Sequence, residues 1–275
     1  MYSGLMLTRY AGRILGAHQK IDRTARRRLE KLVETKKFPK YREIVRFEGK
    51  NGPDGIKVKS PAQDEPWHFY NPFDNDDTKL LGIIQDHYKL LVGELKQGNR
   101  ERASFEAAWL AHALVDGLTP AHQFPFEEKM SVLRSGENAD TRTTFKEKLI
   151  MHGDTPFEKI RNNWAMWGAK GLFSTHILFE LGVATLILPL NFGELVFSQS
   201  ELDEAVQLGI VEIFERTAKE VGVLEMYHGY TETGWTARLA NDVRHKLGPL
   251  LVRTVTLAWY TAAIEAGMKP KQVSQ

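Results

Sequence analysis

Two histidines and an aspartate lie in an apolar segment, where strongly solvated groups are unexpected. The segment 109–124 reads WLAHALVDGLTPAHQF. Helical steps of three and four residues place His112 and Asp116 on one face with apolar side chains. Burying an unpaired imidazole or carboxylate is costly, so this pair needs either a hydrogen-bonded core arrangement or a metal ion. In the first case His122 is an exposed loop residue; in the second it lies close enough to bind a second ion.

The same spacing recurs in a second apolar segment. His176 and Glu180 stand four residues apart in GLFSTHILFELGVATLILPL, where almost every other residue is apolar. His18 lies in register with Ile14 and Ile21 on the apolar face of the first amphipathic segment. Fully buried titratable groups are rare. Three predicted helices that each bury a histidine therefore favour a shared metal centre over three separate core histidines.

Composition limits the chemistry that these groups can do. The 275 residues are 42% hydrophobic, which is enough for a large buried core. There is no cysteine, so a metal must bind through His, Asp and Glu. With 37 Lys plus Arg against 35 Asp plus Glu, the formal net charge is +2, and nothing global indicates a nucleic-acid partner. Residues 1–17 do not have the pattern of a signal peptide, so we expect a cytoplasmic protein.

Apolar periodicity predicts an all-α fold, with residues 1–275 in one domain. The predicted helices cover 7–36, 78–97, 100–118, 156–168, 171–188, 201–221 and 235–266. Five prolines and the acidic-aromatic run DEPWHFYNPFDND predict a long loop over 38–77. Residues 127–170 are mostly polar, and we expect an exposed insertion or lid there. The apolar run 172–190 is interrupted by His176 and Glu180, which favours a core helix over a membrane span.

These residues resemble the zinc-dependent phospholipase C and single-strand-specific nuclease superfamily, whose members are all-helical enzymes with a trinuclear zinc cluster. The central motif of that family is His, three residues, Asp, five residues, His, with a proline shortly before the last histidine. It matches HALVDGLTPAH, from His112 to His122. The phospholipase branch also carries His-Phe-Tyr-x-Pro, which matches HFYNP, from His68 to Pro72. Asp54 precedes His68 by fourteen residues, as the aspartate ligand of the family does.

The resemblance extends in the same order over nearly the whole chain. His18, in GAHQKIDRTA, matches a histidine on the first helix of the family, and the pair His176 and Glu180 matches the last ligand pair. The implied zinc ligands fall into three groups: Asp54, His68, His112 and Asp116; His122, His176 and Glu180; and His18 with Asp116 bridging. In the family an amino-terminal tryptophan completes the third site, and the MYSG start offers no counterpart. Asp22 could substitute for it, hold a ligand in place, or be a surface acid.

The resemblance implies a function as well. It implies phospholipase C-like hydrolysis of phosphate esters by water that a di- or trinuclear zinc cluster activates, with Asp54 orienting or deprotonating the water. HFYNP and the absence of cysteine favour the phospholipase branch, so we expect a phosphodiester or phospholipid substrate and no stable nucleic-acid partner. Two alternatives stay open: a nuclease-like zinc phosphodiesterase, and a non-catalytic helical binding protein stabilised by zinc.

Several further residues have alternative interpretations. Asp64 or Glu65 could replace Asp54 as the ligand beside His68, because the predicted loop is flexible. The remaining histidines have no partner at ligand spacing, and we expect structural roles for them: His87, His152, His228 and His245. Four aromatic residues could line a substrate groove or pin the loop to the core: Trp67, Phe69, Tyr70 and Phe73. The basic run 26–28 could contact a membrane surface or be simply solvated.

Overall fold

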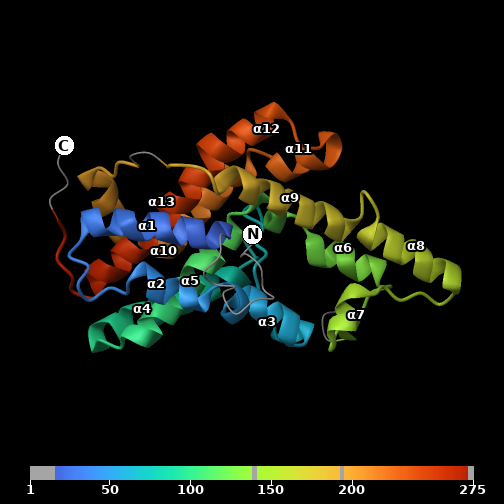
Figure 1. Cartoon of the computed structure of the whole chain (residues 1–275), viewed down its shortest axis with the longest axis horizontal. Coiled ribbons are helices and arrows are strands. Elements are labelled where there is room, and N and C mark those ends of the chain that lie inside the picture. The colour runs from blue at the N-terminus through green and yellow to red at the C-terminus, as the bar shows by residue number, and fades with distance from the viewer. Residues whose placement is uncertain (1–15, 138–140, 193–194, 272–275) are drawn as a thin grey trace.

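The computed structural model describes residues 16–137, 141–192 and 195–271 (Figure 1). These residues form helices joined by turns, and an isolated bridge between Val33 and Pro270 is the only β-pairing among them. The all-α prediction is confirmed. The expected start of the first helix near residue 7, and the place of Ile14 on its apolar face, lie outside the described residues.

The helices have the following bounds. In the first half of the chain they are α1 Ala17–Leu32, α2 Tyr41–Ile44, α3 Pro53–Lys59, α4 Lys79–Gln97 and α5 Arg100–Gly117. The middle contains α6 Phe126–Leu133, α7 Phe145–Leu149, α8 Pro156–Trp167 and α9 Leu172–Ile187. The last part contains α10 Gln199–Gly222, α11 Met226–Thr233, α12 Ala237–Asp242 and α13 Gly248–Glu265. Short 3-10 turns, among them Pro120–Gln123, and a π-helical turn at Val243–Leu247 connect them.

Helix α5 is the buried centre of the main core. It packs against α1, α4 and α13, which is possible at close range because Ala103, Ala107 and Ala111 present small side chains. Trp259 of α13 is fully buried, and its indole N–H donates to the carbonyl oxygen of Ala107 at 3.1 Å. This contact satisfies the polar atom of a large core side chain. The position of α5, and of any side chain that it carries inward, is therefore fixed from several sides.

Both ends of α5 are specified locally. Gly98 ends α4 with a φ of 75°, a left-handed conformation that glycine adopts without strain. The side chain of Asn99 then accepts a hydrogen bond from the backbone N–H of Arg102 and starts α5. At the other end the hydroxyl of Thr119 donates to the carbonyl of Val115 at 2.8 Å, and Pro120 prevents further helix. The chain consequently turns back sharply after Asp116.

Most of the predicted helices are confirmed within a few residues, but the structure differs from the prediction in four places. The first helix ends at Leu32 and not near residue 36. The segment 38–77 is not one loop, because it contains α2 and α3, and Pro53 begins α3 as a proline at a helix start commonly does. Helix α11 was not anticipated. The long helix expected over 235–266 consists of α12, the π-helical turn and α13.

The segment 127–170 is also different from the exposed insertion that we expected. With α9 it forms one end of the molecule, at the right in Figure 1, through α6, α7 and α8. It contributes to a second, smaller hydrophobic core made by Phe69, Phe126, Met130, Met151 and Met166. Most of its side chains are exposed, as expected, but Met130, Met151 and Met166 are buried and tie it to the rest of the fold.

We predict that Gly117→Ala destabilises the protein. A Cβ at this position would lie 2.5 Å from Cδ2 of Leu80 and 2.6 Å from Cζ of Phe214, so core side chains must shift. The expected loss in the free energy of unfolding, measured in denaturant, is about 1 to 3 kcal/mol. Gly93→Ala, inside α4 with nothing within 4 Å of the added atom, is the control. It should raise stability by roughly 0.5 to 1 kcal/mol, and equal effects of the two substitutions would contradict the packing argument.

Candidate metal centre

Three groups of histidine and carboxylate side chains in the described part of the chain can hold a metal ion. Within each group the ligand atoms all lie within 4.8 Å of one another. The groups are His18, Glu48 and His112; Asp54, His112 and Asp116; and His122, His176 and Glu180. Their members come from α1, α3, α5, α9 and the turns at 48 and 120–123. His112 belongs to two groups, so these two are parts of one cluster.

The carboxylate of Asp116 connects all three groups. Its Oδ1 lies 3.2 Å from Nε2 of His18 and 3.7 Å from Nδ1 of His122. Its Oδ2 lies 3.3 Å from Nε2 of His112 and 3.7 Å from Nζ of Lys57. Although complete burial favours the neutral acid, nearby positive charges, among them those of His122, His112 and Lys57, hold the pKa of Asp116 well below its ordinary value. The ionised form, which a metal ligand requires, is thus favoured for Asp116.

Hydrogen bonds to the backbone orient two of the histidines. Nδ1 of His122 donates to the carbonyl of Asp116 at 3.0 Å, and Nδ1 of His68 donates to the carbonyl of Pro66 at 3.1 Å. A carbonyl oxygen only accepts, so each Nδ1 carries the hydrogen and each Nε2 keeps its lone pair. The N–H of Tyr70 donates to the carbonyl of His122 and joins the two segments. Both imidazoles are thus held in the tautomer that binds a metal through Nε2.

A buried glutamate, Glu48, orients His112. Its Oε2 lies 3.1 Å from Nδ1 of His112, while Nε2 of this ring faces the carboxylates of Asp54 and Asp116. Burial alone would lower the pKa of His112, but these three carboxylates raise it well above its ordinary value. Sequence analysis missed Glu48, because this glutamate, in REIVRFEGKN, has no histidine or carboxylate at ligand spacing.

The first helix contributes His18 and Asp22. The ring of His18 stacks on that of His112 with a centroid distance of 4.0 Å. Asp22 is buried, which excludes its interpretation as a surface acid. Burial and the nearby charge of Glu48 raise the pKa of Asp22 well above its ordinary value, which favours the neutral acid. It does not belong to any of the three ligand groups.

The group of His122, His176 and Glu180 matches the predicted one. Oε1 of Glu180 lies 2.7 Å from Nε2 of His122 and 3.4 Å from Nε2 of His176. Burial lowers the pKa of His122 to about 4, so this imidazole is neutral at physiological pH. Burial opposes the ionisation of Glu180, but nearby positive charge, together with the interactions of His176 and His122, holds its pKa well below its ordinary value. Two imidazoles and one carboxylate are available together.

Of the two other expected ligands, Asp54 lies in the predicted group and His68 does not. Asp54 lies in the first turn of α3, with Oδ1 3.6 Å from Nε2 of His112, in the predicted group. His68 was expected in that group too, but its ring lies beside His122, with a centroid distance of 4.8 Å, and it is not among the grouped ligand atoms. The alternatives to Asp54 are elsewhere: Asp64 is exposed, and Glu65 pairs with Lys148.

Lys57 is a charged member of the cluster that sequence analysis did not identify. It lies one helical turn after Asp54 on α3, with Nζ 2.9 Å from Oδ1 of that residue. Burial would lower the pKa of Lys57, but Asp54 and Asp116 raise it above its ordinary value. Because its ammonium contacts two predicted ligands, a metal ion bound to them competes with Lys57. The helical spacing after Pro53 could have indicated this contact, had α3 been predicted.

The cluster opens into a pocket of about 520 Å³. Asp54, Lys57, His68, His122, His176 and Glu180 line one part of it. The rest is mainly apolar and comes from α6 to α9 and the segment at Phe69: Phe69, Phe126, Met130, Phe145, Leu149, Met166, Phe173, Ile177 and Leu181. Of the four aromatic residues near His68, only Phe69 lines this pocket. Tyr70 packs in the core against Phe214, and the ammonium of Lys79 lies over the ring of Trp67.

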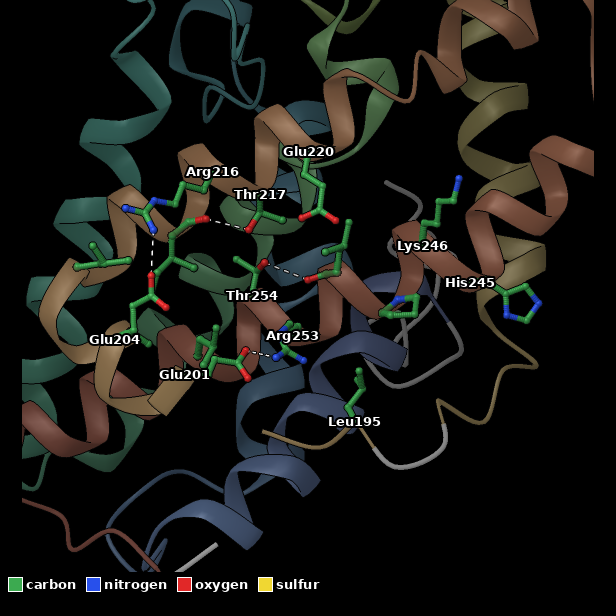
Figure 2. A pocket seen from close by; sticks show the side chains of 16 residues that line it. Leu195, Glu201, Glu204, Arg216, Thr217, Glu220, His245, Lys246, Arg253 and Thr254 are labelled. Atoms are coloured by element: carbon green, nitrogen blue, oxygen red, sulfur yellow. Dashed lines mark hydrogen bonds and ion pairs between the residues drawn. The ribbon is translucent and has the colours of Figure 1, made fainter. Parts of the chain in front are cut away.

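The other histidines and the other cavities do not form comparable sites. His87 pairs with Glu106 at 2.6 Å, His228 pairs with Glu232 on the surface, and His152 is exposed. Figure 2 shows a second pocket, of about 620 Å³, between α10 and α13. There Arg216 pairs with Glu204 and Arg253 with Glu201, while His245 points away from both pairs. None of the three ligand groups of the described chain lies in this pocket.

The distances within the cluster fit a zinc ion. With bonds of 2.0 to 2.1 Å, tetrahedral ligands of zinc lie about 3.3 Å apart. The observed separations between imidazole nitrogens and carboxylate oxygens include 3.2 Å for His18 with Asp116 and 3.4 Å for His176 with Glu180. Imidazole and carboxylate without thiolate is also the donor set of catalytic zinc sites. The described chain thus contains candidate sites for a divalent ion, and zinc suits their donors.

Comparison of the chain with protein-family models, with curated proteins and with solved structures finds no match. The metal centre therefore rests on the geometry of this chain alone.

We predict that Glu48→Gln weakens zinc binding about 10- to 100-fold. Glutamine keeps the size of the side chain but removes the negative charge that faces Nδ1 of His112. Competition with a chromophoric chelator measures the affinity. Asp64→Asn is the control, because it makes the same change from carboxylate to carboxamide at an exposed residue of the same segment. It should leave the zinc affinity unchanged. Equal affinities of wild type and Glu48→Gln would exclude an orienting role.

Lys57→Met should have the opposite effect on metal binding. Methionine retains the apolar part of the side chain but removes the ammonium that contacts Asp54 and Asp116. Because this ammonium competes with a cation, we expect zinc affinity to rise roughly tenfold, which corresponds to ~1.4 kcal/mol. Isothermal titration calorimetry with zinc measures the change. A lower affinity in Lys57→Met would show that Lys57 supports the site and does not compete.

Proposed function

We propose that the protein is a zinc-dependent hydrolase of phosphate esters. One observation carries the proposal: a single buried carboxylate, Asp116, contacts members of three ligand groups, two of which border an apolar pocket. A structural zinc site is usually closed and solitary. Adjacent sites that share ligands and reach a cavity are instead typical of two-metal hydrolysis.

The side chains of the cluster divide into holding and reacting groups. The grouped histidines and the grouped carboxylates other than Glu48 would hold the metal ions, and Asp54 would have a second role. Bound zinc in such a site supplies Lewis acidity toward phosphoryl oxygens and lowers the pKa of a coordinated water. Glu48 and the backbone carbonyls keep the imidazole rings in the required orientation. No serine or cysteine nucleophile is needed for this chemistry.

Asp54 and Lys57 are the groups that can act directly on the substrate. Both line the pocket, and both are partly accessible to it. Burial opposes the ionisation of Asp54, but Lys57 and His112 hold its pKa well below its ordinary value. A carboxylate with such a low pKa is a weak base, so its role would be to orient an attacking water by accepting a hydrogen bond. The ammonium of Lys57, displaced from the carboxylates by a metal ion, can bind a phosphoryl oxygen.

The pocket favours a phosphodiester with an apolar group, such as a phospholipid, over a polynucleotide. Nucleic-acid channels combine uncompensated positive charge with stacking platforms. Here the two other cations of the pocket are compensated, since Arg142 pairs with Glu127 at 2.6 Å and Lys148 with Glu65. The remaining surface is made by methionine, leucine and phenylalanine side chains, which suit an acyl chain.

The test is to measure zinc content and hydrolysis together. We expect at least two zinc ions per chain by mass spectrometry, and hydrolysis of bis(p-nitrophenyl) phosphate and phosphatidylcholine. Asp116→Asn should lose at least roughly 100-fold in rate, because a bridging ligand matters at least as much as the groups behind the ligands. His245→Asn, which changes an exposed histidine outside the cluster, is the control. Fewer than two zinc ions, or rates indifferent to Asp116→Asn, would exclude the proposed activity.

A further inference from the structure

Helix α8 presents an apolar face to solvent. Phe157, Ile160 and Trp164 are 74%, 70% and 72% exposed, and they lie three and four residues apart on one side of the helix. The opposite side is buried through Asn162 and Met166. Exposed aromatic and aliphatic residues are normal singly, but a row of three at helical spacing marks an interaction surface. We call Phe157, Ile160, Arg161 and Trp164 the outer face of α8.

The exposure is not a consequence of a poorly packed helix. Trp167 anchors α8 to α7, because its indole N–H donates to the carbonyl of Leu149 at 2.6 Å. Asn162 donates to the carbonyl of His152, and Asn163 to that of Met151.

By length and composition, the stretch Pro156–Ile187 is apolar enough to cross a membrane, and only 33% of its most apolar part is buried. This stretch consists of two separate helices, α8 and α9, so it is not one continuous membrane-spanning helix. Its exposed apolar side chains instead form a surface on α8.

The charges around the outer face fit an anionic lipid surface. Lys159, Arg161 and Lys170 are all exposed, on α8 or directly after it. The one acidic residue of α8, Glu158, accepts a hydrogen bond from the backbone N–H of Asp154 at the helix start. Aromatic residues flanked by Lys and Arg on a surface helix are typical of proteins that lie in the interface of a bilayer.

The inner side of α8, opposite its outer face, borders the pocket of the metal centre. Met166, on the inner side of the same helix, lines that pocket. Phe145 and Leu181 line it too, and they are 53% and 36% exposed, so apolar side chains extend from the pocket to the surface. In Figure 1, α7, α8 and the start of α9 occupy the same end of the molecule. A bilayer in contact with this end would lie beside the pocket.

We propose that the outer face of α8 docks the protein on phospholipid bilayers that contain anionic lipid. Phe157, Ile160 and Trp164 insert among the head groups, and Arg161, Lys159 and Lys170 contact the lipid phosphates. A second copy of the chain is a poorer occupant. In a symmetric contact through this face the exposed cations of both copies, Lys159, Arg161 and Lys170, would lie close together, which is unfavourable. Delivery of a lipid to the pocket rests on the proposed function, but the docking itself does not.

Co-sedimentation of the full chain with vesicles tests the docking. Vesicles of phosphatidylcholine and phosphatidylglycerol should bind the wild type, and vesicles of phosphatidylcholine alone should bind it more weakly. Phe157→Ser combined with Trp164→Ser should reduce partitioning at least about tenfold, given the apolar area removed. Arg161→Glu should reduce it roughly fivefold, and only with anionic vesicles. Val206→Ser combined with Val223→Ser, which changes exposed apolar residues on and beside α10, is the matched control and should bind like wild type.

Three results would overturn the docking: no binding of wild type to anionic vesicles, unchanged binding of the Phe157/Trp164 variant, or a wild-type dimer in solution that this variant abolishes. Circular dichroism should show equal melting temperatures, because the substituted residues are exposed. Hydrolysis of the soluble bis(p-nitrophenyl) phosphate separates the two proposals, since the outer face does not line the pocket. If vesicle binding is lost in the variant while no form hydrolyses the soluble ester, the enzyme proposal fails and the docking stands. If the soluble ester is hydrolysed but the wild type does not bind vesicles, the docking proposal fails and the enzyme proposal stands.

Discussion

The buried carboxylate of Asp116 is the constraint on which the arrangement of this protein depends. Helix α5 carries it into the centre of the main core, where an ionised group is stable only with cations or hydrogen-bond donors around it. Each neighbouring element meets this need with one side chain: α1 with His18, α3 with Lys57, and the turn after α5 with His122. The core is thus organised around a charge that most cores exclude.

The end of α5 shows how local sequence produces this geometry. Thr119 and Pro120 stop the helix directly after the aspartate, and a 3-10 turn brings His122 back over the helix end. The carbonyl of Asp116, which Pro120 cannot reach with a backbone N–H, accepts hydrogen bonds from the N–H of Thr119 and from Nδ1 of His122. A backbone carbonyl at the helix end therefore helps to fix the tautomer of a metal ligand. The spacing from Asp116 to His122 is a consequence of this turn.

The sequence could predict those parts of the structure in which apolar or ligand residues recur at helical spacing. Long amphipathic helices and the pairs His112 with Asp116 and His176 with Glu180 repeat at helical spacing, and the structure contains them. Glu48 and Lys57 could not be found in this way, because each reaches the cluster alone, from short elements that lack a full period. The side on which His68 lies depends on a hydrogen bond between Tyr70 and His122, which is a long-range contact without a local signal.

The two ends of the molecule differ in how they are held together. Around α5 the contacts are those of a close-packed core of alanine, leucine and isoleucine side chains. The segment from α6 to α8 has only a small core, three of whose five residues are methionines, and it depends on single hydrogen bonds such as that from Trp167 to Leu149 and that from Arg134 to Glu147. Methionine adapts to changes in shape, and regions with few buried contacts open at lower free energy than a main core. The ligands of the metal centre come mainly from the rigid part and the apolar lining of the pocket from the adaptable part, so the pocket can change its width while most of the ligands stay in place.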